Sequence, residues 1–313
     1  MSTGFTGGDP GGDLTLRLRA MWHSQNSRRR VQVPGTLLRR RTDPKPVAQT
    51  RDSSAHRDPS AYKAGITAAQ VVFGDHCLGP VGKVDVAKAM QLLHPRRDAA
   101  IAIVGGGLGG FGRALAAAGP FRVTSFDPDR RLLALIGRRD LNVRPLPPDG
   151  ADEGRFDHAV IDGLGHRAGD ILPLIPPAAA LLGAGGALLL RTYVRVRGVR
   201  HDRRRQPRCD QRSLIPAIDE IRAALGQAGF TVRQEQSCAD IHAAAIEATW
   251  RNAVDLVRIV HRTPDQRRLV PALLDTGEAW QQRVELIRGG AIDARWILAV
   301  RDSAAAEESP IPR

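Results

Sequence analysis

An apolar run followed by five glycines within six positions constrains this chain more than any other feature. Ala99–Val104 has the composition of a buried parallel strand, and the sequence Gly-Gly-Gly-Leu-Gly-Gly follows it at 105–110. Arg113–Ala118 then has a helical pattern, and Phe121–Phe126 has the pattern of a second strand. Strand, glycine loop, helix and strand within about thirty residues predict one βαβ unit. Such a unit indicates an α/β protein with a mainly parallel sheet.

The glycine loop is typical of a turn that holds a nucleoside. Residues without side chains let the backbone turn tightly and approach a nucleotide at a helix N-terminus. Asp127 closes the second strand, and a carboxylate at that place can accept hydrogen bonds from both ribose hydroxyls. We therefore predict a nucleoside cofactor on Gly105, Gly107, Gly109 and Asp127. In the alternative reading the glycines only permit close packing and Asp127 only forms a turn.

Strands and helices continue to alternate along the chain. Further strands are predicted at Asn142–Leu146, Phe156–Ile161, Ala187–Tyr193, Phe230–Gln234 and Ile292–Val300. Helices are predicted at Ala64–Val72, Lys83–Leu93, Arg130–Arg139, the later part of Ile171–Leu182, Leu214–Gln227, Asp240–Val260, and from Thr263 to Gly289 with a break or kink at Pro271. These patterns predict one folded domain over residues 61–302, with residues 240–290 as a helical insertion before the last strand.

The two ends of the chain differ from this domain in composition. Residues 1–60 are rich in Gly, Pro, Ser and Arg, and we predict mostly disordered tails at 1–60 and 303–313. A short helix at residues 14–22 is the exception. It could dock on the folded domain or lie on an anionic surface, and docking is the simpler interpretation.

The composition narrows the classes of partner. The net charge is +13, but all but four of the 46 basic residues are arginine, which together with abundant Ala, Gly and Pro suggests coding bias. We therefore infer no nucleic-acid partner from charge alone. No run of eighteen apolar residues predicts a membrane span, and no leader is recognisable at the start. Three separated cysteines predict neither a disulfide framework nor a metal site, and they favour a reducing, cytoplasmic location. The oligomeric state cannot be read from these features.

Several short segments, in order along the chain, are similar to one known family. They are Phe73–Gly82 (an FGxGxLxPGG-like entry segment), Phe156–Asp162 (a fourth-strand motif), Leu181–Leu190 (an LLxPGGxLLL-like approach to strand five) and Glu278–Leu286. With the glycine loop they make residues 70–301 resemble class I S-adenosylmethionine-dependent methyltransferases, closest to the small-molecule branch of phosphoethanolamine and quinone-precursor enzymes. The resemblance implies a Rossmann-like sheet of seven strands, mostly parallel, with helices on both faces and the last strand antiparallel. It also implies S-adenosylmethionine as cofactor and methyl transfer to a small-molecule acceptor.

Methyl transfer requires few side chains, because the sulfonium is already activated and the protein mainly holds the acceptor in line. A base is needed only where the acceptor must lose a proton. His166, after the fourth strand, is the predicted catalytic base, and His76 in the entry segment is a second candidate. Asp162, at the carboxyl end of the fourth strand, is predicted to contact cofactor or acceptor, with a helix cap as the alternative.

The sequence departs from the family at three positions. Ile103 stands where the family has an acid that helps to hold the methionyl ammonium of the cofactor. Ala184 replaces a usual proline, and Thr192 stands where relatives often carry an acid before the tyrosine, here Tyr193. These departures predict weaker cofactor binding or a degenerate site more than they predict a different fold.

Two other functions stay open at this point. A flavin or nicotinamide oxidoreductase would use the same glycine loop, and Ile103 fits that fingerprint better. A methyltransferase-like interaction module without catalysis would explain the departures. The arginine-rich stretch Arg191–Arg212 fits an anionic acceptor or peripheral contact with a membrane surface, although a solvated loop is the simpler interpretation.

Overall fold

The computed structural model describes residues 59–136, 143–147, 154–165, 171–196, 215–260 and 269–302. The predicted tails therefore lie outside the described residues, except that a helix begins at Pro59. So does most of the arginine-rich stretch, of which only residues 191–196 are described.

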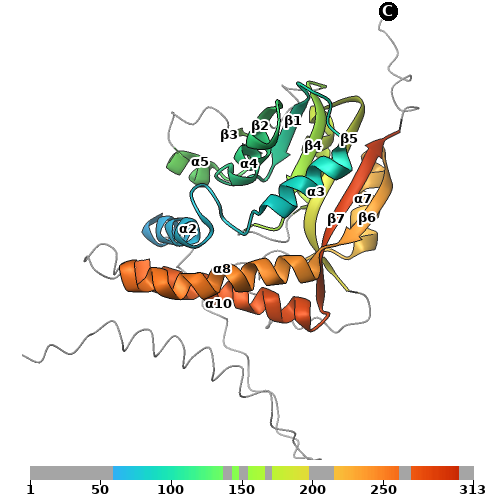
Figure 1. The fold of residues 1–313 in the computed structure, drawn as a ribbon. Helices are drawn as coiled ribbons and strands as arrows, with labels where there is room; N and C mark the ends of the chain where they lie inside the picture. Colours follow the sequence, from blue (N-terminus) through green and yellow to red (C-terminus); the bar gives the residue numbers. More distant parts are fainter. Residues whose placement is uncertain are drawn as a thin grey trace, which may run out of the picture.

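A seven-stranded sheet forms the centre of the domain (Figure 1). Its strands are β1 (Ala100–Val104), β2 (Arg122–Asp127), β3 (Val143–Pro145), β4 (Phe156–Asp162), β5 (Leu182–Arg195), β6 (Phe230–Ser237) and β7 (Ile292–Arg301). The strand order is β3-β2-β1-β4-β5-β7-β6. Strand β7 runs antiparallel to both β5 and β6, and the pairs from β3 to β5 are parallel. The predicted fold class is confirmed.

Helices cover both faces of the sheet. On one face, α3 (Lys83–Leu93) and α4 (Gly110–Ala118) share a hydrophobic cluster with Ile101 and Ile103. On the other face, α6 (Ile175–Leu181) and α7 (Ile218–Gln227) share a cluster with Ala100, Ala102 and Val104. Because side chains alternate along a strand, β1 contributes to both layers, and all five of its residues are buried. The shorter α5 (Arg130–Ile136) and the 3-10 helix η3 (Leu172–Leu174) complete the connections.

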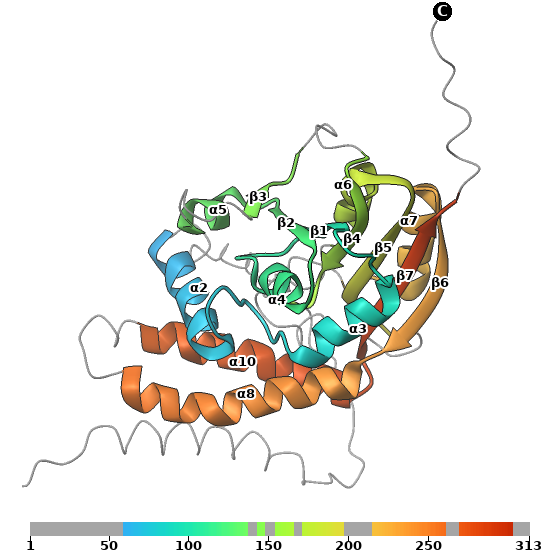
Figure 2. The same cartoon turned by 45° about the horizontal axis from the view of Figure 1, so that its top comes forward.

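Three further helices lie side by side below the sheet in Figures 1 and 2. They are α2 (Pro59–Phe73), α8 (Ala239–Val260) and α10 (Leu269–Arg288), the last two inserted between β6 and β7. The Phe73 ring lies 4.9 Å from that of Trp280 and 6.4 Å from that of Trp250, centroid to centroid, which joins the three helices. We call this group the helical cap.

Some predicted boundaries were wrong. Helix α7 begins at Ile218 rather than at the predicted Leu214. Pro216 disfavours helical backbone at the residue before it, Ile215. The Glu220 carboxylate then accepts the Ala217 N–H at 2.6 Å, at the start of the helix. Helix α10 continues through Pro271 without a break, since this proline falls in the first turn of the described helix, where its missing N–H leaves no partner unsatisfied. Within the described residues, no helix is both long and apolar enough to cross a membrane.

Candidate cofactor site

The glycine loop between β1 and α4 adopts backbone conformations that favour glycine. Gly105, Gly107 and Gly109 have φ angles of 72°, 61° and 87°. A Cβ on Gly107 would lie 3.0 Å from the end of the Leu78 side chain, so a larger residue there would also have to shift Leu78. The three predicted glycines are therefore required by the backbone, and Gly105 and Gly107 also line the pocket.

Five N–H groups of this loop already donate hydrogen bonds within the protein. Gly105 and Gly106 donate to the Phe126 carbonyl (2.8 and 3.3 Å), Gly107 to Asp127 Oδ2 (2.9 Å), Gly109 to the Gly106 carbonyl (2.9 Å) and Gly110 to the His76 carbonyl (3.0 Å). A ligand phosphate that took its hydrogen bonds from these five N–H groups would have to displace their protein acceptors.

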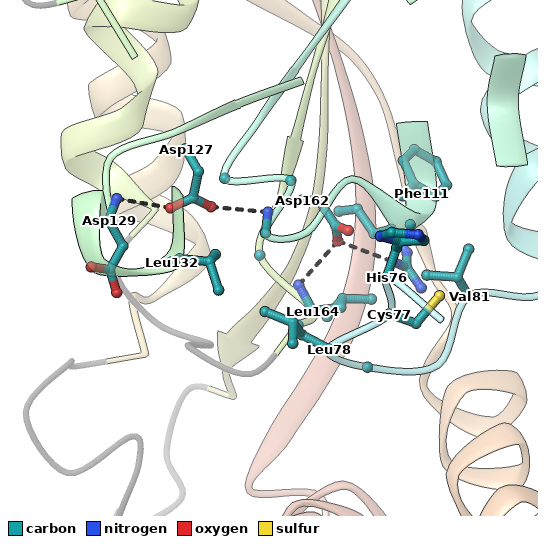
Figure 3. Close-up of a pocket in the computed structure, with 18 of the residues that line it drawn as sticks. His76, Cys77, Leu78, Val81, Phe111, Asp127, Asp129, Leu132, Asp162 and Leu164 are labelled. Carbon is teal, nitrogen blue, oxygen red and sulfur yellow. Dashed lines mark hydrogen bonds and ion pairs between the residues drawn. The ribbon is translucent and has the colours of Figure 1, made fainter. Parts of the chain in front are cut away.

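Asp127 lies at the end of β2 and is 6% exposed. Its Oδ2 accepts the N–H of Gly107 at 2.9 Å and its Oδ1 accepts the N–H of Asp129 at 2.8 Å (Figure 3). Backbone donors thus fix the carboxylate beside the glycine loop.

Asp162 lies at the end of β4, in register with Arg191 on β5. Arg191 donates from Nη1 to Asp162 Oδ1 at 2.9 Å, and its Nη2 lies 2.8 Å from the Pro80 carbonyl oxygen and 3.0 Å from Asp85 Oδ1. The centres of the Phe111 and Trp296 rings lie 5.3 and 5.6 Å from the central carbon of its guanidinium. Burial alone would lower the pKa of Arg191, but the Asp162 and Asp85 carboxylates outweigh it and raise that pKa. Arg191 is therefore a buried cation shared by two carboxylates.

The part of the entry segment that follows α2, residues 74–82, closes the pocket from the side of α4. A Cβ on Gly110 would lie 2.6 Å from Cys77 Sγ, so the segment passes in close contact with the first turn of α4. His76 has a φ of 63°, its N–H is accepted by Gln70, and its carbonyl accepts the N–H of Gly110. Burial, and next the charge of Asp162, raise the pKa of the Cys77 thiol, so it stays protonated at neutral pH.

Helix α2 forms the opposite wall. The Tyr62 hydroxyl donates to Asp129 at 2.7 Å, and the Arg131 guanidinium lies 4.6 Å from the centre of the Tyr62 ring. Ile66 packs with Leu108 and Leu132 in a small buried cluster beside these polar groups. This end of the pocket therefore offers an apolar surface next to the Asp127 carboxylate.

Together these segments line one pocket at the carboxyl edge of the parallel strands. It collects the predicted Gly105, Gly107, Asp127 and Asp162 together with His76, whereas Gly109 supports the turn and does not line the pocket. His166 lies outside the described residues. Among the described residues, no group of three or more His, Cys, Asp or Glu side chains is placed to hold a metal ion.

Sequence reasoning missed several residues of the site. They are Tyr62, Ile66, Asp85, Asp129 and Arg191. One signal could have found Arg191, because it is a lone charged residue that directly follows the apolar run 187–190 in a predicted central strand. The partner Asp85 lies more than a hundred residues away, on α3, and no local pattern connects the two.

Two of the positions where the chain departs from the resembled family, Ile103 and Thr192, lie in the interior. Ile103 is fully buried, and its Cγ2 would lie 3.0 Å from a Cβ on Gly106. Tyr193 lies outside the pocket, and its hydroxyl is 2.7 Å from His242 Nε2 in the interior. Burial lowers the pKa of His242 well below its usual value, so this histidine is neutral.

The strand order, the antiparallel β7, the glycine loop after β1 and the carboxylate after β2 together define the class I methyltransferase fold. A scan of protein-family models gives no match, and a search of curated proteins gives no similar sequence.

Solved structures share the fold at low identity. One is phosphoethanolamine N-methyltransferase 2 of Haemonchus contortus with phosphomonomethylethanolamine and S-adenosylhomocysteine: TM-score 0.63, 16% identity, covering 82% of this chain and 60% of that chain. A second is the 4+2 cyclase SpnF: TM-score 0.57, 14% identity, covering 78% of this chain and 95% of that one. A third is a putative sarcosine dimethylglycine methyltransferase of Galdieria sulphuraria: TM-score 0.55, 15% identity, covering 77% and 99%. The present chain thus spans about 60% of the length of the nematode enzyme.

Proposed function

We propose that this chain binds S-adenosylmethionine in the pocket and transfers its methyl group to a small-molecule acceptor. One observation carries the proposal: five N–H groups of the glycine loop are bound to acceptors of the protein itself. A flavin or nicotinamide dinucleotide needs such donors for its pyrophosphate at the helix N-terminus. A nucleoside without phosphate needs only the close approach of the turn and a carboxylate for the ribose.

The charge of the pocket supports the same choice. The charged side chains that line it are Asp127, Asp129, Asp162 and Arg191, and Arg191 is already held by Asp162 and Asp85. S-adenosylmethionine is a cation, since its sulfonium and ammonium outweigh its carboxylate, whereas a pyrophosphate is an anion. A pocket with excess negative charge stabilises the former and disfavours the latter.

Different residues of the pocket would contact different parts of the cofactor. Asp127 would accept the ribose hydroxyls, and the apolar wall of Ile66 and Leu132 would contact the base. When bound, the cofactor supplies an electrophilic methyl group on sulfur. The protein then has to orient the acceptor and exclude water. The entry segment, the residues after β4 and the first turn of α4 form the mainly apolar wall suited to this, lined by Leu78, Val81, Leu164, Leu174 and Phe111.

A proton acceptor is proposed at His76, which is a histidine in the lining of the described pocket. His166 remains a second proposal from the sequence. Arg191 is held by two carboxylates, so it does not support the expected anionic acceptor.

Incubation with methyl-labelled S-adenosylmethionine and a small-metabolite extract tests the activity. Label should move into the small-molecule fraction, and His76→Gln should slow the transfer while cofactor affinity stays the same. No label transfer by a protein that binds the cofactor would instead support the second candidate, a cofactor-binding protein without methyl transfer. The buried, apolar Ile103 and the cyclase that shares this fold favour that candidate.

A further inference from the structure

We propose that Asp162 binds the ammonium group of the cofactor's methionyl part, and that Arg191 is the positioning residue that fixes Asp162 and the entry segment around it. The inference rests on the proposed function, because it assigns the second half of the same ligand. Four features of the site lead to it: the strand order, the hydrogen bonds of Asp162, the balance of charge, and the contacts of Arg191.

The strand order places the two ends of the ligand. The sheet runs β2-β1-β4, so Asp127 and Asp162 lie at the ends of the two strands that flank the glycine loop. Neighbouring strands are about 4.8 Å apart, which puts these strand ends about 10 Å from each other. A ribose held at Asp127 therefore directs its 5′ substituent across the loop toward β4.

Both carboxylates are on the face of the sheet that α4 covers. Ile103 is in register with Ser125 on β2 and with Val160 on β4. Side chains alternate along a strand, so Asp127 and Asp162, each two residues further on, project to the same face. Strand β1 itself presents apolar Ile103 there, which leaves Asp162 as the carboxylate on this side of the loop.

Asp162 has one carboxylate oxygen to offer a ligand. Its Oδ1 accepts from Arg191 Nη1 at 2.9 Å and from the Leu164 N–H at 3.4 Å. Its Oδ2 accepts no hydrogen bond from the described part of the chain, and the side chain lines the pocket while only 10% exposed. An ammonium group has three donors and would match this oxygen (Figure 3).

The charge balance favours a cation at this oxygen. Arg191 carries one positive charge and is shared between Asp162 and Asp85, so the three side chains together carry one negative charge. The arginine therefore holds Asp162 without neutralising the site. A charge-assisted bond from an ammonium would be strong here, because Asp162 is mostly shielded from water.

Arg191 connects the segments that surround this position. Its Nη2 lies 2.8 Å from the Pro80 carbonyl oxygen, at the end of the entry segment, and 3.0 Å from Asp85 on α3. Its side chain is 1% exposed. Since the guanidinium is fixed on several sides, Asp162 is held in place before the ligand binds, and little freedom is lost on binding.

Two ligands separate this assignment from the proposed function. S-adenosylhomocysteine carries the amino-acid part, and 5′-methylthioadenosine has the same nucleoside without it. Calorimetric titration of both ligands should show tighter binding of S-adenosylhomocysteine by the wild-type protein. Asp162→Asn should weaken S-adenosylhomocysteine about tenfold or more and leave methylthioadenosine within about twofold. Asp127→Asn is the matched control and should weaken both ligands.

Asp85→Asn tests the positioning role of Arg191 without removing a pocket residue. It should weaken the binding of S-adenosylhomocysteine about threefold and leave the binding of methylthioadenosine unchanged. General destabilisation of the protein would not change the ratio of these two affinities. If the wild-type protein binds both ligands, and Asp162→Asn weakens their affinities equally or not at all, the assignment of Asp162 is wrong while the proposed function still stands. A wild-type protein that binds neither ligand would overturn the proposed function as well.

Discussion

The two strand ends that flank the glycine loop hold their carboxylates in different ways. Asp127, after β2, is fixed by the backbone N–H groups of Gly107 and Asp129. Asp162, after β4, is fixed by the guanidinium of a buried arginine that also contacts Asp85 and the Pro80 carbonyl. The first arrangement is local to the loop, whereas the second joins β4, β5, α3 and the entry segment.

This difference shows that the two halves of one site depend on the chain in different ways. A carboxylate that is held by nearby backbone N–H groups, as at Asp127, needs only a short sequence motif, and losing the carboxylate affects only a few residues. A carboxylate held by a buried cation depends on residues far apart in the sequence. Removing the cation leaves Asp162 and Asp85, whose side chains are only 10% and 19% exposed, without the positive charge that they share. We therefore expect the β4 side to be the more sensitive to substitution.

Substitution of Arg191 should cause the largest loss of stability. Arg191→Met keeps much of the volume but leaves Asp162 and Asp85 without their cation, and removal of one partner from a buried pair destabilises by about 3–5 kcal/mol. Urea denaturation would measure the loss. Arg222→Met, which removes the half-exposed partner of Glu235, is the control and should cost less than about 1 kcal/mol. Equal losses in the two variants would contradict the account.

A third carboxylate on the same face of the sheet, at position 103 on β1, tests whether this strand could hold the ammonium group instead. Ile103→Asp restores the acid of the resembled family, but Ile103 is fully buried beneath the glycine loop. We expect a loss of about 3 kcal/mol or more in the free energy of unfolding without tighter cofactor binding, because the new charge has no cation beside it. Ile103→Val, with an expected loss of about 0.5–1.5 kcal/mol, is the control. A stable variant that binds S-adenosylhomocysteine more tightly would show that the ammonium lies at β1.

Most of the sheet could be predicted from the sequence, and the reasons are local. The apolar run of β1 and the alternation of β7 are patterns of single strands, so Ala99–Val104 and Ile292–Val300 were predicted nearly to the residue. Strand β5 was predicted from Ala187 but begins at Leu182, because glycines at 183, 185 and 186 resemble a turn although Leu182 pairs with Phe156 on β4.

The same distinction applies to the site. Asp127 follows a glycine motif at a fixed distance and was predicted. The contact of Arg191 with Asp85, and that of Tyr62 with Asp129, bring together residues that only the folded chain places side by side. No pattern in one segment contains that information.

Substitution of Asp127 should have a smaller effect on stability than that of Arg191. Asp127→Asn keeps an acceptor oxygen for only one of two N–H groups, those of Gly107 and Asp129, so we expect a loss of about 1 kcal/mol. Urea denaturation beside Arg191→Met gives the comparison. A loss as large as that of Arg191→Met would mean that the local carboxylate is not the less sensitive one.

The pH dependence of stability gives the smallest predicted effect. Burial lowers the pKa of His242, with a further contribution from Arg191, so between that value and about 6.5 the unfolded state binds more protons than the folded state. Stability should therefore fall as the pH falls below about 6.5, by at most about 1.4 kcal/mol per pH unit from this group.

The residue-specific part of this slope can be isolated. His158 contributes in the same direction, since burial also lowers its pKa. Unfolding curves from about pH 7 to pH 5 should be shallower in pH for His242→Gln, in which an amide can still bond the Tyr193 hydroxyl. An unchanged slope in this variant would show that the pKa of His242 is the same in the folded and unfolded states.

The central claim is that the glycine loop and its two carboxylates hold an adenosyl amino acid rather than a dinucleotide. Parallel calorimetric titrations of the wild-type protein with S-adenosylhomocysteine and with NAD test it most directly. The account predicts saturable binding of S-adenosylhomocysteine and no detectable binding of NAD, because the loop donors are bound to protein acceptors and the pocket is acidic. Binding of NAD without binding of S-adenosylhomocysteine would contradict it.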